Sequence, residues 1–464
     1  MKEMKIFVSI LCLFLVGCVS YLDQAEVAQQ AILSGDFETL SSVALAEAEQ
    51  SRNEALLWQL EAGAALRAQG KIKESVVCFE RVESALQAEE ERADFSVSEE
   101  LVGAFSNEYA QAYRPKPVDR IFASTYQLLN WIELGDFARA RVAVTRLRFV
   151  QEKWGNREIY LSASAKTGNE AAVVKASQEG QTKLALDQIE NDLSTYGVAS
   201  TYDDAFSHWL QGMYFMHTAR EASDYERARK EFLAATQLNS DCSVIQADQA
   251  DCEKLIQGKS LERLVYVVVE KGHAPEWYEQ RIDFPAFLIS DRVSFVSVAL
   301  PAIRPAKPDY SLALNLDDKG LRLSPISRPE ALVAQHFAAS FSTLKTRAVI
   351  SAVTKTASAY AINKATEQRE KRRQDNESRW LRLIGQIGAG VYTVASTQAD
   401  LRHWRSLPAR FSLARLTAPS GSKISVVGRP EVSCILPEGK VLLVSVKSSS
   451  EYSPVTLRCT VLLP

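Results

Sequence analysis

Apolar side chains recur three and four residues apart from about Asp23 to Gln237, and few prolines interrupt them. This spacing places apolar side chains on one face of a helix. After Lys259 the pattern changes, and three stretches are rich in β-branched and aromatic residues, as is typical of strands: Leu264–Glu270, Ile282–Ile289 and Val293–Leu300. The chain is therefore predicted to be α+β, with a helical part first and a β-rich part second.

The helical part contains internal repeats. Small residues at 63 and 75, a large residue at 66, a glycine at 70 and apolar residues at 79 and 82 have the spacing of a tetratricopeptide repeat. Further turns of this kind lie at Gly35-Asp36-Phe37, Gly135-Asp136-Phe137 and Ser223-Asp224-Tyr225. The sequence predicts tetratricopeptide-like helix pairs over residues 18–258. The alternative is a non-repetitive helical bundle with similar turns.

Two insertions interrupt the predicted array. Residues 89–118 contain a charge run followed by Tyr113-Arg114-Pro115-Lys116-Pro117, which should form a loop because prolines are frequent there. Residues 151–200 are polar and should include one helix from Glu170 to Leu193.

The β-rich part is expected to be one domain, residues 259–464, with a helical hairpin inserted at about 329–395. The first helix of the hairpin should cover roughly Pro329–Arg369, and the second, which contains several glycines, roughly Trp380–Ala395. Those glycines could indicate membrane insertion, but nearby arginines and the short apolar length favour packing against the first helix. Strands are predicted again from Ala409 to the end.

The N-terminus has the form of an export signal. A lysine-bearing start precedes an apolar run, Ile6–Val16, that is shorter than the about 20 residues needed to span a bilayer. The run ends in Leu15-Val16-Gly17-Cys18, which resembles the bacterial lipobox. That resemblance implies a signal peptide at 1–17 and lipid on Cys18: diacylglycerol on the sulfur and an acyl chain such as palmitate on the new amino group. Val19, which is not aspartate, favours the outer membrane. The alternative is a buried cysteine in an ordinary signal.

Composition limits the partners and the covalent links. The 464 residues are 46% hydrophobic and carry a formal net charge of −3, which supports packed cores and gives no indication of a nucleic-acid partner. Disulfides are allowed in an oxidising compartment. Cys434 and Cys459 are predicted to form one. Cys242 and Cys252 could form another disulfide or be separate buried thiols, and these pairings leave Cys78 without a predicted partner.

The sequence contains no convincing catalytic or metal-binding motif. Ser342-Thr343-Leu344-Lys345 has the Ser-x-x-Lys form of penicillin-binding enzymes, but the accompanying motifs are missing. The cysteines and the five histidines lack the spacing of metal ligands. We therefore expect no enzymatic activity, no metal and no cofactor.

Two segments resemble a known family. One runs from Asp119-Arg120-Ile121 to Asn130-Trp131-Ile132-Glu133-Leu134-Gly135-Asp136, and the other is Thr397-Gln398-Ala399-Asp400-Leu401-Arg402-His403-Trp404-Arg405-Ser406-Leu407-Pro408-Ala409-Arg410. Together with the lipobox they are similar to poorly characterised bacterial envelope lipoproteins with tetratricopeptide-like repeats. The resemblance implies no catalytic residues, and Cys18 is the one functional residue that it assigns to this chain.

A candidate peptide groove lies in the fourth repeat. Arrays of helical repeats bind peptides and proteins on a curved surface. The positions that usually face this groove form an apolar, sulfur-rich strip: Phe206, Trp209, Met213, Met216 and His217. The alternative, which we favour, is that the 151–200 insertion or the β-rich domain covers the strip and makes it core.

The function predicted from the sequence is that of a non-enzymatic, lipid-anchored scaffold. It would face the periplasm from the outer membrane, bound to the membrane through its N-terminal lipid, and would bind other envelope proteins in cell-envelope assembly. Two alternatives remain open. One is an activator of a peptidoglycan synthase. The other is a glycan-binding lipoprotein with Trp404 or Tyr452 as a stacking platform.

Overall fold

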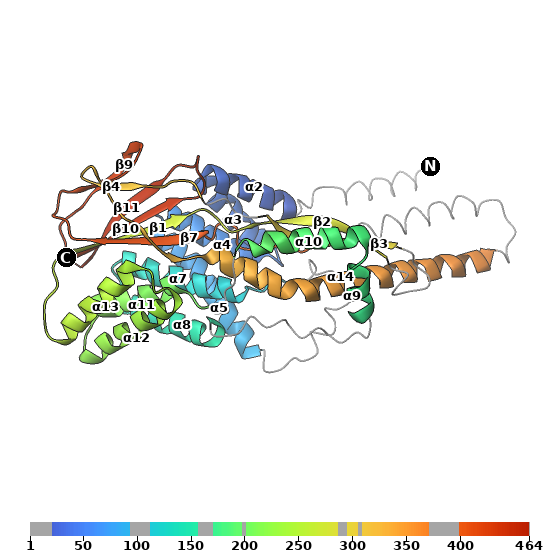
Figure 1. The fold of residues 1–464 in the computed structure, drawn as a ribbon, viewed down its shortest axis with the longest axis horizontal. Helices are drawn as coiled ribbons and strands as arrows, with labels where there is room; N and C mark the ends of the chain where they lie inside the picture. Colours follow the sequence, from blue (N-terminus) through green and yellow to red (C-terminus); the bar gives the residue numbers. More distant parts are fainter. Residues whose placement is uncertain are drawn as a thin grey trace, which may run out of the picture.

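The computed structural model describes residues 21–92, 112–155, 170–196, 201–285, 295–304, 309–370 and 399–463. The predicted signal peptide, Cys18 and the predicted helix at 380–395 lie outside these residues. Within them the protein is α+β, as predicted, with helical repeats followed by β-sheets (Figure 1).

Consecutive helices of the N-terminal part pack in antiparallel pairs, and a further helix follows the last pair. The pairs are α2 (Tyr21–Ser34) with α3 (Phe37–Gln50), α4 (Ala55–Ala68) with α5 (Ile72–Arg92), α7 (Pro117–Glu133) with α8 (Phe137–Val150), and α11 (Ala205–Thr218) with α12 (Ala222–Leu238), and the closing helix is α13 (Ser243–Ile256).

The recurring turns of the array follow from glycine and aspartate. Gly35, Gly70 and Gly135 have φ angles of 72°, 80° and 69°, a conformation that glycine adopts without a steric penalty. Asp36 and Asp136 follow two of these glycines and cap the next helix, each accepting a hydrogen bond of 3.0 Å from the backbone N–H three residues later. The dipeptide therefore recurs because it ends one helix and begins the next.

The small residues of the repeat pattern allow close helix packing. A Cβ added to Gly63 of α4 would lie 2.8 Å from the ring of Phe79 on α5. A Cβ added to Gly212 of α11 would lie 2.6 Å from the ring of Phe232 on α12. Because no side chain fits in that space, these two positions require glycine.

Among the described residues, the 151–200 insertion contains a π-helical turn, η3 (Gln151–Gly155), and two α-helices where the sequence predicts one. The two are α9 (Glu170–Ser177) and α10 (Gly180–Ser194), and Gly180, the first residue of α10, has a φ of 39°. The turn lets α10 pack against a two-stranded hairpin. The Thr182 hydroxyl of α10 donates a hydrogen bond to the Asp283 carbonyl of the hairpin at 2.6 Å.

That hairpin consists of β2 (Glu276–Pro285) and β3 (Phe295–Arg304). The predicted strands, 282–289 and 293–300, overlap β2 and β3 in part, residues 286–289 and 293–294 lie outside the described residues, and the observed strands extend further, to Glu276 and Arg304. The sequence pattern follows the apolar side chains, whereas the observed strands also include polar positions of β2 that pair with β3, such as Glu279 opposite Pro301.

Two further sheets pack against each other. A five-stranded sheet has the order β11-β10-β1-β7-β6, and a four-stranded sheet has the order β5-β4-β8-β9. Their strands are β1 (Leu264–Lys271), β4 (Leu314–Leu316), β5 (Lys319–Gly320), β6 (Ser324–Ser327), β7 (Arg410–Leu416), β8 (Lys423–Val426), β9 (Arg429–Ile435), β10 (Val441–Ser448) and β11 (Thr456–Leu463).

The central strand β1 is buried on both faces. Val265, Val267 and Val269 belong to the apolar cluster between the two sheets, whereas Tyr266 and Val268 belong to the cluster that contains the repeat helices. Successive side chains of a strand point to opposite faces. The helical part and the β-rich part therefore share one core, although helix changes to strand near the expected boundary at residue 258.

A disulfide joins Cys434 of β9 to Cys459 of β11. This disulfide was predicted from the sequence, and because β9 and β11 belong to different sheets, the bond links one sheet to the other. Cys242, Cys252 and Cys78 are free and buried. Of the two alternatives for Cys242 and Cys252, the structure therefore shows separate buried thiols.

The long helix α14 (Pro329–Glu370) forms an arm together with its neighbours. Its first half packs against β3, α9 and α10, and its last turns extend beyond them and away from the repeats (Figure 1). The first helix of the predicted hairpin therefore lies close to its expected bounds.

Candidate functional site

The candidate peptide groove is closed. Phe206, Trp209, Met213 and Met216 on α11 are fully buried, and His217 is partly buried at the end of the helix. The candidate groove is therefore excluded, and the alternative that the sequence favoured, that the strip is core, describes the structure.

The β-rich part fills the space that a bound peptide would occupy. The ring of Phe206 stacks on Phe411 of β7 with centroids 4.2 Å apart. The indole N–H of Trp209 donates to Asp248 of α13 at 2.8 Å, and its ring meets that of Tyr266 of β1 edge-on. The strands β1 and β7 pair with each other, and both lie against α11.

The polar groups behind this strip form a closed network. Tyr266 donates its hydroxyl proton to Asp248 at 2.9 Å, and His217 Nε2 lies 2.9 Å from the same hydroxyl. Burial raises the pKa of Asp248 to about 6, although Arg415 opposes the shift. Burial, together with Arg415, lowers the pKa of His217 to about 3, so the imidazole is neutral. These groups hydrogen-bond to one another and hold α11 and α13 against the sheet.

A segment without helix or strand crosses the concave face of the array. We call residues 399–409 the strap. The buried carboxylate of Glu61 on α4 accepts the backbone N–H groups of Arg405 and Ser406 at 2.6 and 3.1 Å. Trp404 lies between Phe79 and Tyr126, with centroids 6.1 and 5.9 Å away. The strap thus fixes the sheet to the first repeats.

The two aromatic candidates for glycan stacking lie in opposite environments. Trp404 is 2% exposed in the strap, so its proposed role as a stacking platform is wrong. Tyr452 is 88% exposed in the loop between β10 and β11 and remains accessible.

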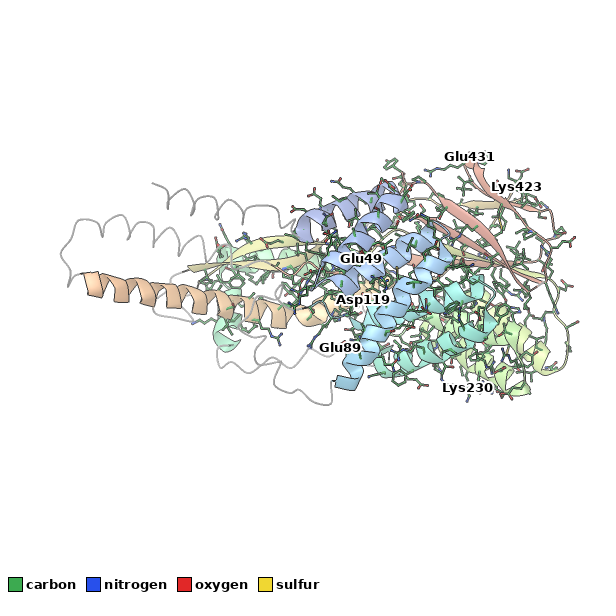
Figure 2. The ribbon with its side chains drawn as sticks, turned by 180° about the vertical axis from the view of Figure 1, so that it is seen from behind. Glu49, Glu89, Asp119, Lys230, Lys423 and Glu431 are labelled. Carbon is green, nitrogen blue, oxygen red and sulfur yellow. A yellow bond between two sulfur atoms is a disulfide. The ribbon has the colours of Figure 1, made fainter. Side chains whose placement is uncertain are left out.

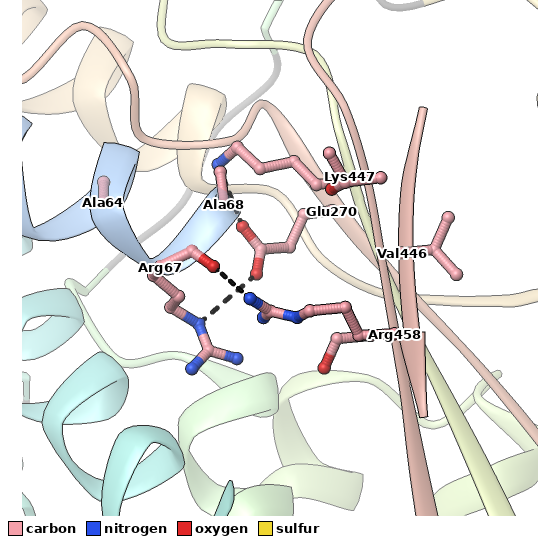
Figure 3. A pocket seen from close by; sticks show the side chains of 9 residues that line it. Ala64, Arg67, Ala68, Glu270, Val446, Lys447 and Arg458 are labelled. Carbon is pink, nitrogen blue, oxygen red and sulfur yellow. Dashed lines mark hydrogen bonds and ion pairs between the residues drawn. The ribbon is translucent and has the colours of Figure 1, made fainter. Parts of the chain in front are cut away.

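A charged cluster lies where the array meets the sheet (Figure 3). We call it the seam cluster, and it comprises Arg67 of α4, Glu133 of α7, Glu270 of β1, Lys447 of β10 and Arg458 of β11. The small cavity beside it has room for about one water molecule.

Each carboxylate of the seam cluster faces two cations. Glu270 contacts Lys447 at 3.1 Å and Arg67 at 3.9 Å, and it accepts the Tyr126 hydroxyl at 2.7 Å. Glu133 pairs with Arg67 and, at 3.4 Å, with Arg458. Burial alone would raise the pKa of Glu270, but Lys447 and Arg67 outweigh burial and hold that pKa below its usual value. The cluster is suited to holding α4 and α7 on the sheet.

A histidine between two carboxylates lies at the start of α11. His208 Nδ1 is 2.6 Å from Glu231, and Nε2 is 3.0 Å from Asp203. Burial would lower the pKa of His208, but the hydrogen bonds to Asp203 and Glu231 raise it to about 10. The imidazolium is therefore the form that bridges α11 and α12.

The predicted chemical candidates do not assemble into a reactive site within the described residues. Ser342, of the Ser-x-x-Lys pair, is exposed on α14, and burial lowers the pKa of Lys345 one turn later. No group of three His, Cys, Asp or Glu side chains there could hold a metal ion. None of the described helices is long and apolar enough to cross a membrane.

Sequence reasoning missed the seam cluster and the His208 site. The sequence signals for the seam cluster were Glu270, a charge near the end of an apolar strand, and Arg67 in an alanine-rich helix. Buried charges need partners, but the pattern does not say which ones.

Comparison with models of protein families, with characterised proteins and with solved structures gives no match. The two segments that carry the family resemblance lie against each other: the rings of Tyr126 in the first and Trp404 in the second have centroids 5.9 Å apart.

Proposed function

We propose that the protein is a lipid-anchored scaffold of the bacterial envelope, facing the periplasm from the outer membrane, which binds other proteins on the outer face of its repeats. The observation that carries this proposal is the exposed side of α8. Since the protein's own strands and strap fill the concave face, a partner has to bind elsewhere.

Four side chains form what we call the α8 stripe: Arg139, Val142, Arg146 and Phe149. Their spacing of three and four residues places them on one face of the helix. Val142 is 72% exposed and Phe149 46% exposed, and the Arg146 guanidinium lies 5.8 Å from the Phe149 ring centre. The helix has four arginines and no acidic residue, and three of these arginines, at 139, 141 and 148, pair with carboxylates outside the helix. A stripe that is apolar and basic favours an acidic partner with apolar side chains.

Photocrosslinking in cells tests the stripe. A photoreactive amino acid replacing Val142 should give a defined protein adduct, and Phe149→Glu should abolish the adduct by repelling an acidic partner. The matched control is the same amino acid at Leu233 of α12, which is 48% exposed. The same adducts from both positions, or none from position 142, would contradict the proposal.

The lipid anchor has its own test. Cys18→Ser should leave an unprocessed precursor that incorporates no fatty-acid analogue, because the thioether needs the sulfur. Equal labelling of the variant and the parent would exclude the anchor.

Glycan binding is a second candidate, favoured by the exposure of Tyr452. Retention on purified peptidoglycan should then drop in Tyr452→Ala, while the photoadduct at position 142 stays. Equal retention of both proteins would remove this candidate.

A further inference from the structure

The arm helix α14 begins beside the strap. The backbone N–H of Glu330 donates to the Ala409 carbonyl at 3.2 Å, and the Glu330 carboxylate pairs with Arg410 at 2.8 Å. Side chains in the first half, such as Phe337 against Trp277, fix the helix to the hairpin. With 42 residues and a rise of about 1.5 Å per residue, α14 is about 63 Å long. Its last turns project from the molecule in both views (Figures 1 and 2).

The charge of α14 differs from that of the chain as a whole. The chain has 54 basic and 57 acidic residues. Between Ala331 and Thr366, however, the sequence has no acidic residue and four basic ones: Lys345, Arg347, Lys355 and Lys364. Alanine and other apolar residues make up much of the rest. A basic segment without carboxylates is attracted to an anionic lipid surface.

The start of α2 lies at the base of the same arm. The Tyr21 ring is 5.8 Å from that of Trp58, and its hydroxyl accepts a hydrogen bond from Arg405 of the strap. The strap is also the segment to which α14 is bonded. Cys18 lies three positions before Tyr21, and a chain of that length reaches no more than about 11 Å.

The position of the anchor limits how the molecule can meet a membrane. This step rests on the proposed lipid at Cys18. A bilayer perpendicular to the arm and within reach of the anchor would be crossed by α14, and no described helix is apolar enough for that. A bilayer that runs along the arm avoids this crossing. We propose that α14 lies on an anionic phospholipid surface, so that the protein has a second membrane contact besides its lipid.

Vesicle binding tests this contact without the lipid. The chain from Val19 onward, made without the signal peptide and the lipid, should bind vesicles of equal parts phosphatidylglycerol and phosphatidylcholine, bind pure phosphatidylcholine much less, and dissociate as salt is raised. Each basic residue at such a surface is worth about fivefold in binding. Lys355→Glu with Lys364→Glu should thus weaken binding at least tenfold.

The matched control is Lys230→Glu with Lys423→Glu. It changes the net charge equally, but both lysines are exposed at the end of the molecule opposite the arm (Figure 2). Equal binding by the two variants would overturn the proposal, as would equal binding of the parent to both vesicle types at all salt concentrations. If a variant misfolds, the dependence of the parent's vesicle binding on salt and on lipid composition still tests the proposed membrane contact. Failure of Cys18 labelling would count against the anchor alone, because these vesicle measurements need no lipid on the protein.

Crosslinking separates a lipid surface from a protein partner. A photoreactive amino acid at position 355 of the lipidated protein should label phospholipid in cells. A defined protein adduct in place of lipid would assign the arm to a protein partner and overturn the proposal.

Discussion

At the scale of single residues, the aromatic side chains of α11 behave as core. Trp209→Ala should lower the free energy of unfolding by about 3–5 kcal/mol, because it leaves a cavity and removes a hydrogen-bond donor from buried Asp248. A thermal melting curve measures the loss. Tyr452→Ala is the control and should melt like the parent, since that ring is exposed. An unchanged melting temperature for Trp209→Ala would mean that the strip is not core.

His208 makes stability depend on pH. Its pKa is raised from 6.5 to about 10 in the folded protein, so its contribution is fully present below pH 6.5 and is lost as pH rises toward 10. The histidines at 217, 273, 336 and 403 have lowered pKa values, so the stability that they contribute rises as pH passes through 6.5 and offsets part of the His208 loss below about pH 7.5.

Chemical denaturation at pH 6.5, 7.5 and 8.5 measures this dependence. The free energy of unfolding of the parent should fall by about 1–3 kcal/mol over this range, the ceiling being about 1.4 kcal/mol for each pH unit of a one-proton difference. His208→Gln should be less stable at pH 6.5 and show much less decline. A parent whose stability is flat over this range would contradict the assignment of an imidazolium.

At the scale of elements, the seam cluster joins helices to strands through charges that depend on one another. Glu270→Leu should destabilise the protein by about 3–5 kcal/mol, because it leaves Lys447 buried without its carboxylate. Adding Lys447→Met should restore part of that loss. Urea unfolding of the two single variants and the double variant gives the coupling energy. Additive losses would show that the two side chains do not depend on each other.

At the scale of the whole molecule, the shared core predicts that the two parts unfold together. Tyr266 and Val268 of β1 belong to the same apolar cluster as the repeat helices. A chain ending at residue 258 would expose that face of the array and should not give a cooperative melting transition. The full-length protein should show one transition by circular dichroism and by tryptophan fluorescence. A native-like transition in the shortened chain would show that the repeats fold independently.

The sequence by itself determined the features that depend on neighbouring residues. The helix pairs follow from apolar spacing, their turns from Gly35-Asp36 and Gly135-Asp136, and the close packing from Gly63. Strand β1 was recognisable from its β-branched residues. These elements are local because caps, turns and periodicity act over a few residues.

The tertiary structure alone decided where the elements meet. Trp209 has the same apolar character whether it faces a peptide or β1, and only pairing of the sheet shows that β1 and β7 lie on it. Glu270 and Lys447 are 177 residues apart in sequence, so no local pattern could pair them. The concave face of the array is filled because β1, which follows the repeats, pairs with strands from the C-terminal end of the chain and carries them onto α11. The physical reason is that burial and charge pairing depend on distances in space between residues that are far apart in the sequence. Local sequence patterns do not contain those distances, and only the folded chain sets them.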